Sequence, residues 1–107
     1  MEIHQSDIGF LSDTAINAAC TAFKVSVPQF LSESRLATLC NARRAACNLM
    51  FDAGITNCRT IAICIHRTHS TVYHHLATHK NLYLYDHQYQ KSYDKAQSIM
   101  AANHGKE

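Results

Sequence analysis

The chain is poor in residues that interrupt helices. Its 107 residues include one proline and three glycines, and no segment alternates strictly between apolar and polar residues as a half-buried strand would. Proline lacks a backbone N–H and glycine loses more conformational entropy on folding, so both are disfavoured inside helices. Their scarcity favours an all-α fold of about six helices, which we expect to form a single domain over residues 1–107.

Long hydrophobic runs are also absent. No apolar segment approaches the roughly 20 residues that span a bilayer. The acidic start, MEIHQSD, lacks the basic and apolar regions of a signal peptide. The five cysteines are odd in number and scattered through segments with helical patterns, which is typical of a reducing compartment. We therefore expect a cytoplasmic protein with no membrane partner.

Motifs of enzymatic chemistry are missing as well. The sequence has no G-x-x-x-x-G-K-[ST] phosphate-binding loop, no cysteine with a partner at nucleophile spacing and no recognisable carboxylate pair. We expect a protein that is not an enzyme and has no catalytic residue and no cofactor.

Eight histidines raise the question of a metal site. The candidate zinc ligands are Cys58, Cys64, His66 and His69. Structural zinc sites usually contain a closely spaced cysteine pair, which this sequence lacks, so we expect no metal. A pH response is a second hypothesis: His69 and His74, placed at DNA phosphates, would strengthen binding as the pH falls toward about 6.

What the chain does have is positive charge concentrated in its middle third. The net charge is +2 overall, but residues 35–80 carry all five arginines and Lys80 against Asp52 alone, a net charge of +5. Residues 1–34 sum to −3, and residues 81–107 sum to zero. A basic centre within a near-neutral chain predicts a face that binds a polyanion.

Apolar periodicity and capping residues predict the helices. We expect them over about residues 12–23, 26–31, 36–53, 58–65, 69–79 and 82–102. Ser12 or Asp13 is the expected cap of the first helix, Gly54 ends the third, and Asn57 and Thr68 cap the fourth and fifth. The last helix is expected to pack through one stripe: Leu82, Tyr85, Tyr89, Tyr93, Ala96 and Met100.

The fourth and fifth helices have the layout of a helix-turn-helix over about residues 57–80. They are separated only by a tight turn, and the expected inward-facing residues are Ile61, Ile65, Val72 and Leu76. In this motif the second helix enters the major groove by its N-terminal end. The residues exposed there would be His69, Ser70, Tyr73 and His74, with Thr68 and Thr71 beside them.

These residues resemble a known family, the C-terminal DNA-binding domain of the bacterial replication initiator DnaA. The family has an R-D-H-T-T-V signature where its recognition helix starts, and this chain has R-T-H-S-T-V at residues 67–72. Residues 15–27 look like the family's first helix and turn, Ser34-Arg35 like its Ser-Arg, and residues 42–46 like its Ala-Arg-Gln or Pro-Arg-Gln stretch. The resemblance covers about residues 14–100.

The resemblance implies a role for individual residues. Arg35 matches an arginine that enters the minor groove, while Arg43 and Arg44 match positions that touch the DNA backbone and base edges. The implied major-groove readers are Thr68, His69, Ser70 and Thr71. As further DNA contacts we predict Arg59, Arg67, His74 and Lys80.

The sequence also departs from the family. Thr68 replaces the aspartate of the signature, and the preceding turn is one residue shorter, with His66 where the family usually has two glycines. The family's target sequence therefore need not carry over. Because no ATPase motif is present, we expect a stand-alone regulator of replication or transcription, for instance from a phage or mobile element, that binds double-stranded DNA.

An alternative is a protein-interaction module with the same fold. It would bind itself as a homodimer, or a host replication protein, through the acidic N-terminal segment or the tyrosine-rich face. Arginines clustered with the start of the 69–79 helix would favour DNA binding, whereas dispersed arginines would favour the interaction module.

Overall fold

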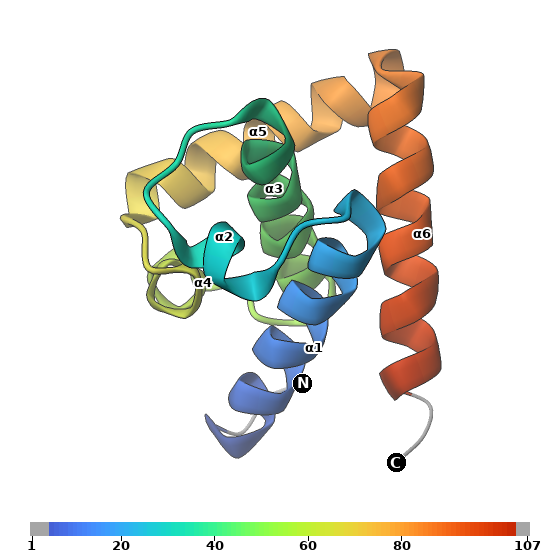
Figure 1. The fold of residues 1–107 in the computed structure, drawn as a ribbon. Helices are drawn as coiled ribbons and strands as arrows, with labels where there is room; N and C mark the ends of the chain where they lie inside the picture. Colours follow the sequence, from blue (N-terminus) through green and yellow to red (C-terminus); the bar gives the residue numbers. More distant parts are fainter. Residues whose placement is uncertain (1–4, 105–107) are drawn as a thin grey trace.

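The structure, a computed structural model, describes residues 5–104, with side chains over residues 7–103, and consists of helices with no strand in that range. Figure 1 shows the six helices: α1 (Gln5–Phe23), α2 (Val27–Leu31), α3 (Ala37–Asp52), α4 (Cys58–Ile65), α5 (His69–Tyr85) and α6 (His87–His104). The prediction of an all-α fold with about six helices is confirmed. Within the described range no helix combines the length and apolar composition needed to cross a membrane.

The core forms where α1, α3 and α6 meet and extends beneath α4 and α5. Helix α1 packs against α3 and α6, and α5 packs against α3, α4 and α6. The facing surfaces of α1 and α3 are rich in fully buried alanines: Ala15, Ala18, Ala19, Ala42, Ala45 and Ala46. Small side chains let two helix axes approach closely. Larger side chains, among them Phe30, Met50 and Tyr89, fill the remaining space.

Four helix boundaries follow from local capping, and three of the caps, at Gly54, Asn57 and Thr68, were predicted. At the start of α2, Ser26 Oγ accepts from the Gln29 amide at 3.2 Å, and Gln29 Oε1 accepts from the Ser26 amide at 3.0 Å. Helix α3 is followed by Gly54 at a φ of 114°, which is accessible mainly to glycine. Asn57 and Thr68 accept backbone amides at the starts of α4 and α5.

The predicted start of the first helix is wrong. Helix α1 begins by Gln5, so Ser12 and Asp13 lie inside it and do not cap it. The hydroxyl groups of Ser12 and Thr14 donate to carbonyls one turn earlier, Gly9 O at 3.1 Å and Phe10 O at 2.7 Å. A serine in a helical sequence therefore bonds backward along the helix here, which is an alternative to capping.

The predicted boundary between the last two helices is also wrong. Helix α5 continues to Tyr85, and α6 begins at His87. The break is at Asp86, whose backbone leaves the helical region and whose Oδ1 accepts from the Tyr89 amide at 3.0 Å. The predicted stripe is therefore divided: Tyr85 is 85% exposed at the end of α5, while its other tyrosines, Tyr89 and Tyr93, are buried on α6.

Candidate nucleic-acid interface

Helices α4 and α5 pack by their apolar faces, as a helix-turn-helix requires. Ile61 and Ile65 of α4 and Val72 of α5 are fully buried, and Leu76 is half-buried. The predicted inward-facing residues are confirmed. This packing leaves the polar side of α5 free to face solvent.

The turn between the two helices depends on a left-handed residue. His66 has a φ of 57°, and the next amide, Arg67 N–H, donates to Ala62 O at 2.9 Å, closing the end of α4. Glycine usually occupies such a position because a side chain is strained there. The short turn of this chain is thus made with histidine in a glycine-like conformation.

The start of α5 presents polar side chains to solvent. Thr68 Oγ1 accepts from the Thr71 amide at 3.4 Å and lies 3.1 Å from Thr71 Oγ1. His69, Ser70, Tyr73 and His74 are exposed, as predicted. The rings of His69 and Tyr73 meet edge to face, with centroids 6.3 Å apart. These residues form a free surface at the helix end that a helix-turn-helix inserts into the major groove.

Arg43 is placed differently from the prediction. It is 2% exposed, and its guanidinium donates four hydrogen bonds to backbone carbonyls. The acceptors are Phe30 O at 2.8 Å, Gln29 O at 3.3 Å, Ser32 O at 2.8 Å and Ser34 O at 2.7 Å. A side chain used in this way does not reach a DNA groove in this structure. Its role is to hold the loop between α2 and α3 in place.

That loop carries Arg35 and is also bound by Arg67. The Arg67 guanidinium donates to Ser32 O, which Arg43 also contacts, and to His66 O at 2.9 Å. Arg35 follows the anchored Ser34 and is exposed. The two anchoring arginines therefore fix the position of a third, whose own side chain faces solvent.

The loop, the α4–α5 turn and the start of α5 enclose a cleft of about 770 Å³. We call it the arginine cleft. Its lining residues are Glu33, Arg35, Cys40, Arg43, His66, Arg67, Thr68, Thr71 and His75. Figure 1 shows these segments on the side of the molecule opposite α6. The structure thus brings three of the five arginines to one cleft beside the start of α5, although Arg43 is buried there.

The remaining predicted contacts lie outside this cleft. Arg44 is half-buried on α3 and donates to Asn41 Oδ1 at 2.6 Å. Arg59 is exposed at the start of α4. Lys80 is exposed on α5, about 16 Å along the helix axis from His69 at 1.5 Å per residue.

Sequence reasoning missed His75. It lines the arginine cleft, is 6% exposed, and its Nδ1 has no hydrogen-bond partner. Burial, with added repulsion from Arg44, His74, Arg43 and Arg67, lowers its pKa to about 4. The available signal was its spacing of four residues after Thr71, which places both on one face of α5.

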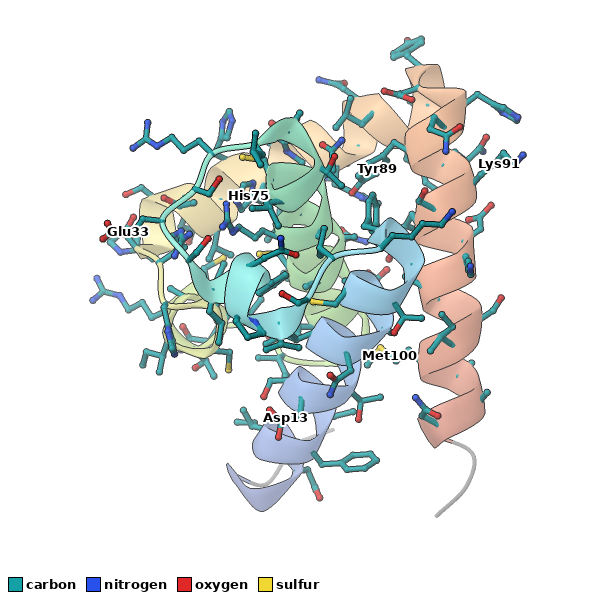
Figure 2. All side chains as sticks on the ribbon, in the orientation of Figure 1. Asp13, Glu33, His75, Tyr89, Lys91 and Met100 are labelled. Carbon is teal, nitrogen blue, oxygen red and sulfur yellow. The ribbon has the colours of Figure 1, made fainter. Side chains whose placement is uncertain are left out.

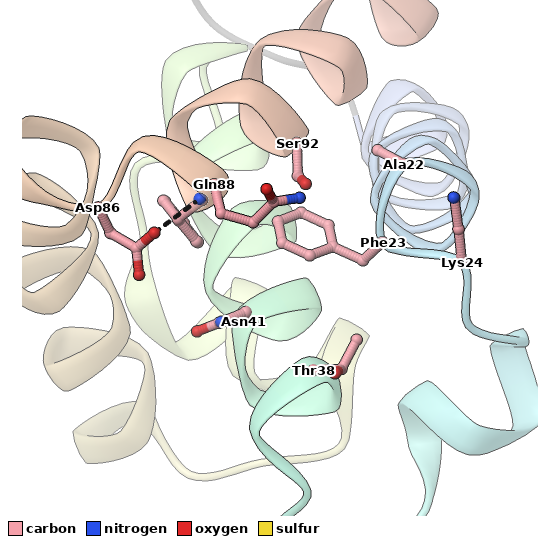
Figure 3. A pocket seen from close by; sticks show the side chains of 9 residues that line it. Ala22, Phe23, Lys24, Thr38, Asn41, Asp86, Gln88 and Ser92 are labelled. Atoms are coloured by element: carbon pink, nitrogen blue, oxygen red, sulfur yellow. Dashed lines mark hydrogen bonds between the residues drawn. The ribbon is translucent and has the colours of Figure 1, made fainter.

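A second, smaller pocket of about 270 Å³ lies where the end of α1 and the start of α3 meet the α5–α6 corner. Figure 3 shows Phe23 and Gln88 pointing toward each other there, beside the hydrogen bond from the Tyr89 amide to Asp86. Its charged lining residues are Lys24 and Asp86, one of each sign. The excess of positive charge is thus a property of the arginine cleft.

Over the part of the chain that the structure describes, no three histidine, cysteine or carboxylate side chains lie together in a way that could hold a metal ion. The four candidate zinc ligands of the sequence do not form such a group.

No protein-family profile, no curated protein and no solved structure matches this chain. The resemblance to the DnaA C-terminal domain stays a prediction that rests on residues 67–72 and the flanking arginines.

Proposed function

We propose that the protein binds double-stranded DNA with a sequence preference, using α4 and α5 as a helix-turn-helix. The observation that carries this proposal is the gathering of Arg35, Arg43 and Arg67 at the cleft beside the N-terminal end of α5. Positive charge next to an exposed, polar helix start is what a phosphate backbone and a major groove require.

Each part of this surface has its own role in the proposal. His69 and Ser70, exposed on the first turn of α5, meet base edges, while the free amides of that turn meet a phosphate. Arg35 extends from the anchored loop toward the adjacent minor groove. Arg59, at the start of α4, and Lys80, farther along α5, add phosphate contacts, which strengthen affinity without reading sequence.

The biological role that we propose is a stand-alone regulator acting at initiator-type sites in replication or transcription. It follows from the resemblance at residues 67–72 and from the missing ATPase motif. In this role the chain occupies DNA rather than acting on it chemically.

A salt titration tests the proposal. Binding is measured by fluorescence anisotropy with a duplex carrying an initiator-type box and with a scrambled duplex. Arg35→Ala should reduce the slope of log K against log salt by about one, and His69→Ala should reduce the preference between duplexes by roughly 5- to 150-fold. Lys91→Ala is the matched control, because Lys91 is exposed on α6, on the far side of the molecule (Figure 2).

The second candidate, a protein-interaction module, is favoured by one specific feature. Leu84 and Tyr85 are 73% and 85% exposed where α5 ends, at the corner with α6. Exposed apolar side chains in adjacent positions are typical of a contact surface. If neither duplex binds near physiological salt, this candidate takes the place of DNA binding.

A further inference from the structure

The arginine cleft contains positive charge that the protein does not neutralise. The hydrogen bonds of Arg43 and Arg67 go to backbone carbonyls, which are polar but carry no net charge. Among the described lining residues three guanidinium groups face one carboxylate, that of Glu33. Glu33 is exposed, and Figure 2 shows it at the outer edge of the molecule.

This concentration of positive charge favours an anionic ligand in the cleft. Burying a guanidinium is costly unless an opposite charge accompanies it. Arg43 is 2% exposed, and burial, followed by repulsion from the nearby Arg67, lowers its pKa. An anion in the cleft would relieve this repulsion.

His75 provides an independent indication of a ligand. It lines the cleft from α5, is more than nine-tenths buried, and its Nδ1 is unpartnered. Buried polar atoms nearly always have a hydrogen-bond partner, so this nitrogen beside the cleft is available to a ligand.

The start of α5 contributes suitable donors. Thr68 and Thr71 line the cleft with hydroxyl groups, and the first amides of a helix have no partner within the helix. The helix dipole also favours negative charge at this end. Guanidinium groups from the loop and hydroxyl and amide donors from the helix thus approach the cleft from two sides.

We propose that the arginine cleft is a binding site for a phosphate group, held between the Arg35 and Arg67 guanidinium groups and the N-terminal end of α5. A phosphate has enough oxygens to accept from both sides at once, and planar guanidinium groups match its geometry. With about 770 Å³, the cleft has room for a phosphate ester as well as the free ion.

This phosphate has two sources with the same chemistry. It belongs either to the DNA backbone, wedged between the α2–α3 loop and α5, or to a small phosphorylated compound. The proposal goes beyond the proposed function, because the site exists whether or not the protein binds DNA.

The test is an NMR titration of the full chain with inorganic phosphate, against sodium chloride at equal ionic strength. We expect saturable shifts of the residue 68–71 amides and of the His75 ring, with a dissociation constant on the order of 1 mM. Arg35→Gln should weaken binding at least about fivefold, because one of the main charge-assisted contacts is lost. Arg59→Gln, which removes the same exposed charge outside the cleft, should change it less than about twofold.

A second variant, Thr71→Val, removes a cleft hydroxyl and leaves every charge in place, so its weakening would locate the ion at the start of α5. Phosphate shifts that do not saturate, or that Arg59→Gln weakens as much as Arg35→Gln does, would overturn the proposal.

The two sources are then separated with a duplex and with adenosine monophosphate at constant ionic strength. Competition between the duplex and inorganic phosphate for the same resonances assigns the site to the DNA backbone. Tighter binding of adenosine monophosphate than of phosphate, without competition from the duplex, assigns it to a small phosphorylated compound. If the duplex does not bind, the proposed function is contradicted, but the phosphate titration still tests the phosphate site by itself.

Discussion

Two buried histidines lie one turn apart in the middle of α5, in opposite environments. His75 lines a cleft that also contains three arginines, and its Nδ1 has no partner. One turn later, His79 Nδ1 lies 2.7 Å from Tyr89 Oη, and the ring of Tyr93 is 4.4 Å from the His79 ring between centroids. Burial lowers the pKa of both histidines, but of the two Nδ1 atoms only that of His79 has a partner within the protein.

The surroundings of His79 stabilise the fold, whereas the arginine cleft beside His75 has groups that can bind a ligand. The aromatic cluster at the α5–α6 corner consists of His79, Tyr83, Tyr89 and Tyr93, whose hydroxyl groups and His79 Nδ1 are paired inside the protein. Burial raises the pKa of Tyr93 to about 12, which keeps its hydroxyl neutral as a hydrogen-bond partner of Asn48. The arginine cleft instead has unneutralised charge and an unpaired ring nitrogen. The comparison leads to five predictions, ordered from the largest effect to the smallest.

Removing the centre of the aromatic cluster should have the largest effect on stability. Tyr89 is 2% exposed, so Tyr89→Ala should lower the free energy of unfolding by about 3 to 5 kcal/mol in urea denaturation. Tyr85→Ala is the matched control at an exposed tyrosine and should change it by less than about 0.5 kcal/mol. Equal effects of the two substitutions would contradict the boundary between α5 and α6.

Removing the anchor of the cleft should destabilise the other region. Arg43→Met leaves four carbonyls of α2 and the following loop without this donor, which should lower the free energy of unfolding by about 2 to 3 kcal/mol. The loop bearing Arg35 should also lose order, seen as faster amide hydrogen exchange over residues 32–36. The control, Arg59→Met, should leave both quantities nearly unchanged. A stable Arg43→Met variant with wild-type exchange would show that the loop does not depend on this side chain.

Acid should destabilise the protein through His75. Its folded pKa of about 4 lies below the ordinary value of 6.5, so the neutral folded form is favoured and its stability contribution is complete above about pH 6.5. As the pH falls from 6.5 toward 4, the unfolded chain takes up the proton first, and stability drops by up to about 1.4 kcal/mol per pH unit. In a phosphate-free buffer, His75→Leu should show a smaller slope than the wild type. His79 has the same sign of pKa shift, so part of the slope remains. An unchanged slope would mean that His75 is accessible to protons when folded.

Breaking the hydrogen bond between the His79 ring and Tyr89 should leave His79, like His75, with an unpaired Nδ1. Tyr89→Phe removes the hydroxyl group 2.7 Å from Nδ1 and leaves a second unpaired buried histidine nitrogen in addition to that of His75. The free energy of unfolding should fall by about 1 to 2 kcal/mol, measured by urea denaturation. Tyr85→Phe, at an exposed hydroxyl, should be neutral. No loss in Tyr89→Phe would argue that this bond is replaced by water.

The smallest predicted effect is a gain in stability at the two left-handed residues. His66 and Lys24 have φ values of 57° and 60° and line the arginine cleft and the smaller pocket respectively. His66→Gly and Lys24→Gly should each raise the free energy of unfolding by about 1 kcal/mol, because glycine adopts this conformation without strain. Thermal denaturation measures both variants. If either variant is less stable, the contacts of the original side chain stabilise the protein more than its left-handed backbone conformation destabilises it.

The sequence alone predicts much of the fold because the signals involved act over three or four residues. Ser26, Asn57 and Thr68 each cap a helix through an amide two or three positions away, and Gly54 ends α3 by its own backbone conformation. The buried faces of α4 and α5 follow from helical periodicity, and the excess of positive charge in residues 35–80 is a property of composition. Where local signals compete, as for Ser12 and Asp86, prediction fails by several residues.

The tertiary structure decided which arginines are exposed to solvent and which hydrogen-bond to backbone carbonyls within the protein. Arg43 and Arg44 are neighbours with the same chemistry, but Arg43 bonds to carbonyls 9 to 14 residues away, in α2 and in the following loop, whose path no local pattern specifies. The same holds for His75, whose unpaired nitrogen arises because α5 lies against arginines from α3 and the α4–α5 turn. Local sequence determines the helix boundaries and where charged residues lie along the chain. Whether a charge is buried or neutralised depends on contacts between segments that are far apart in the sequence.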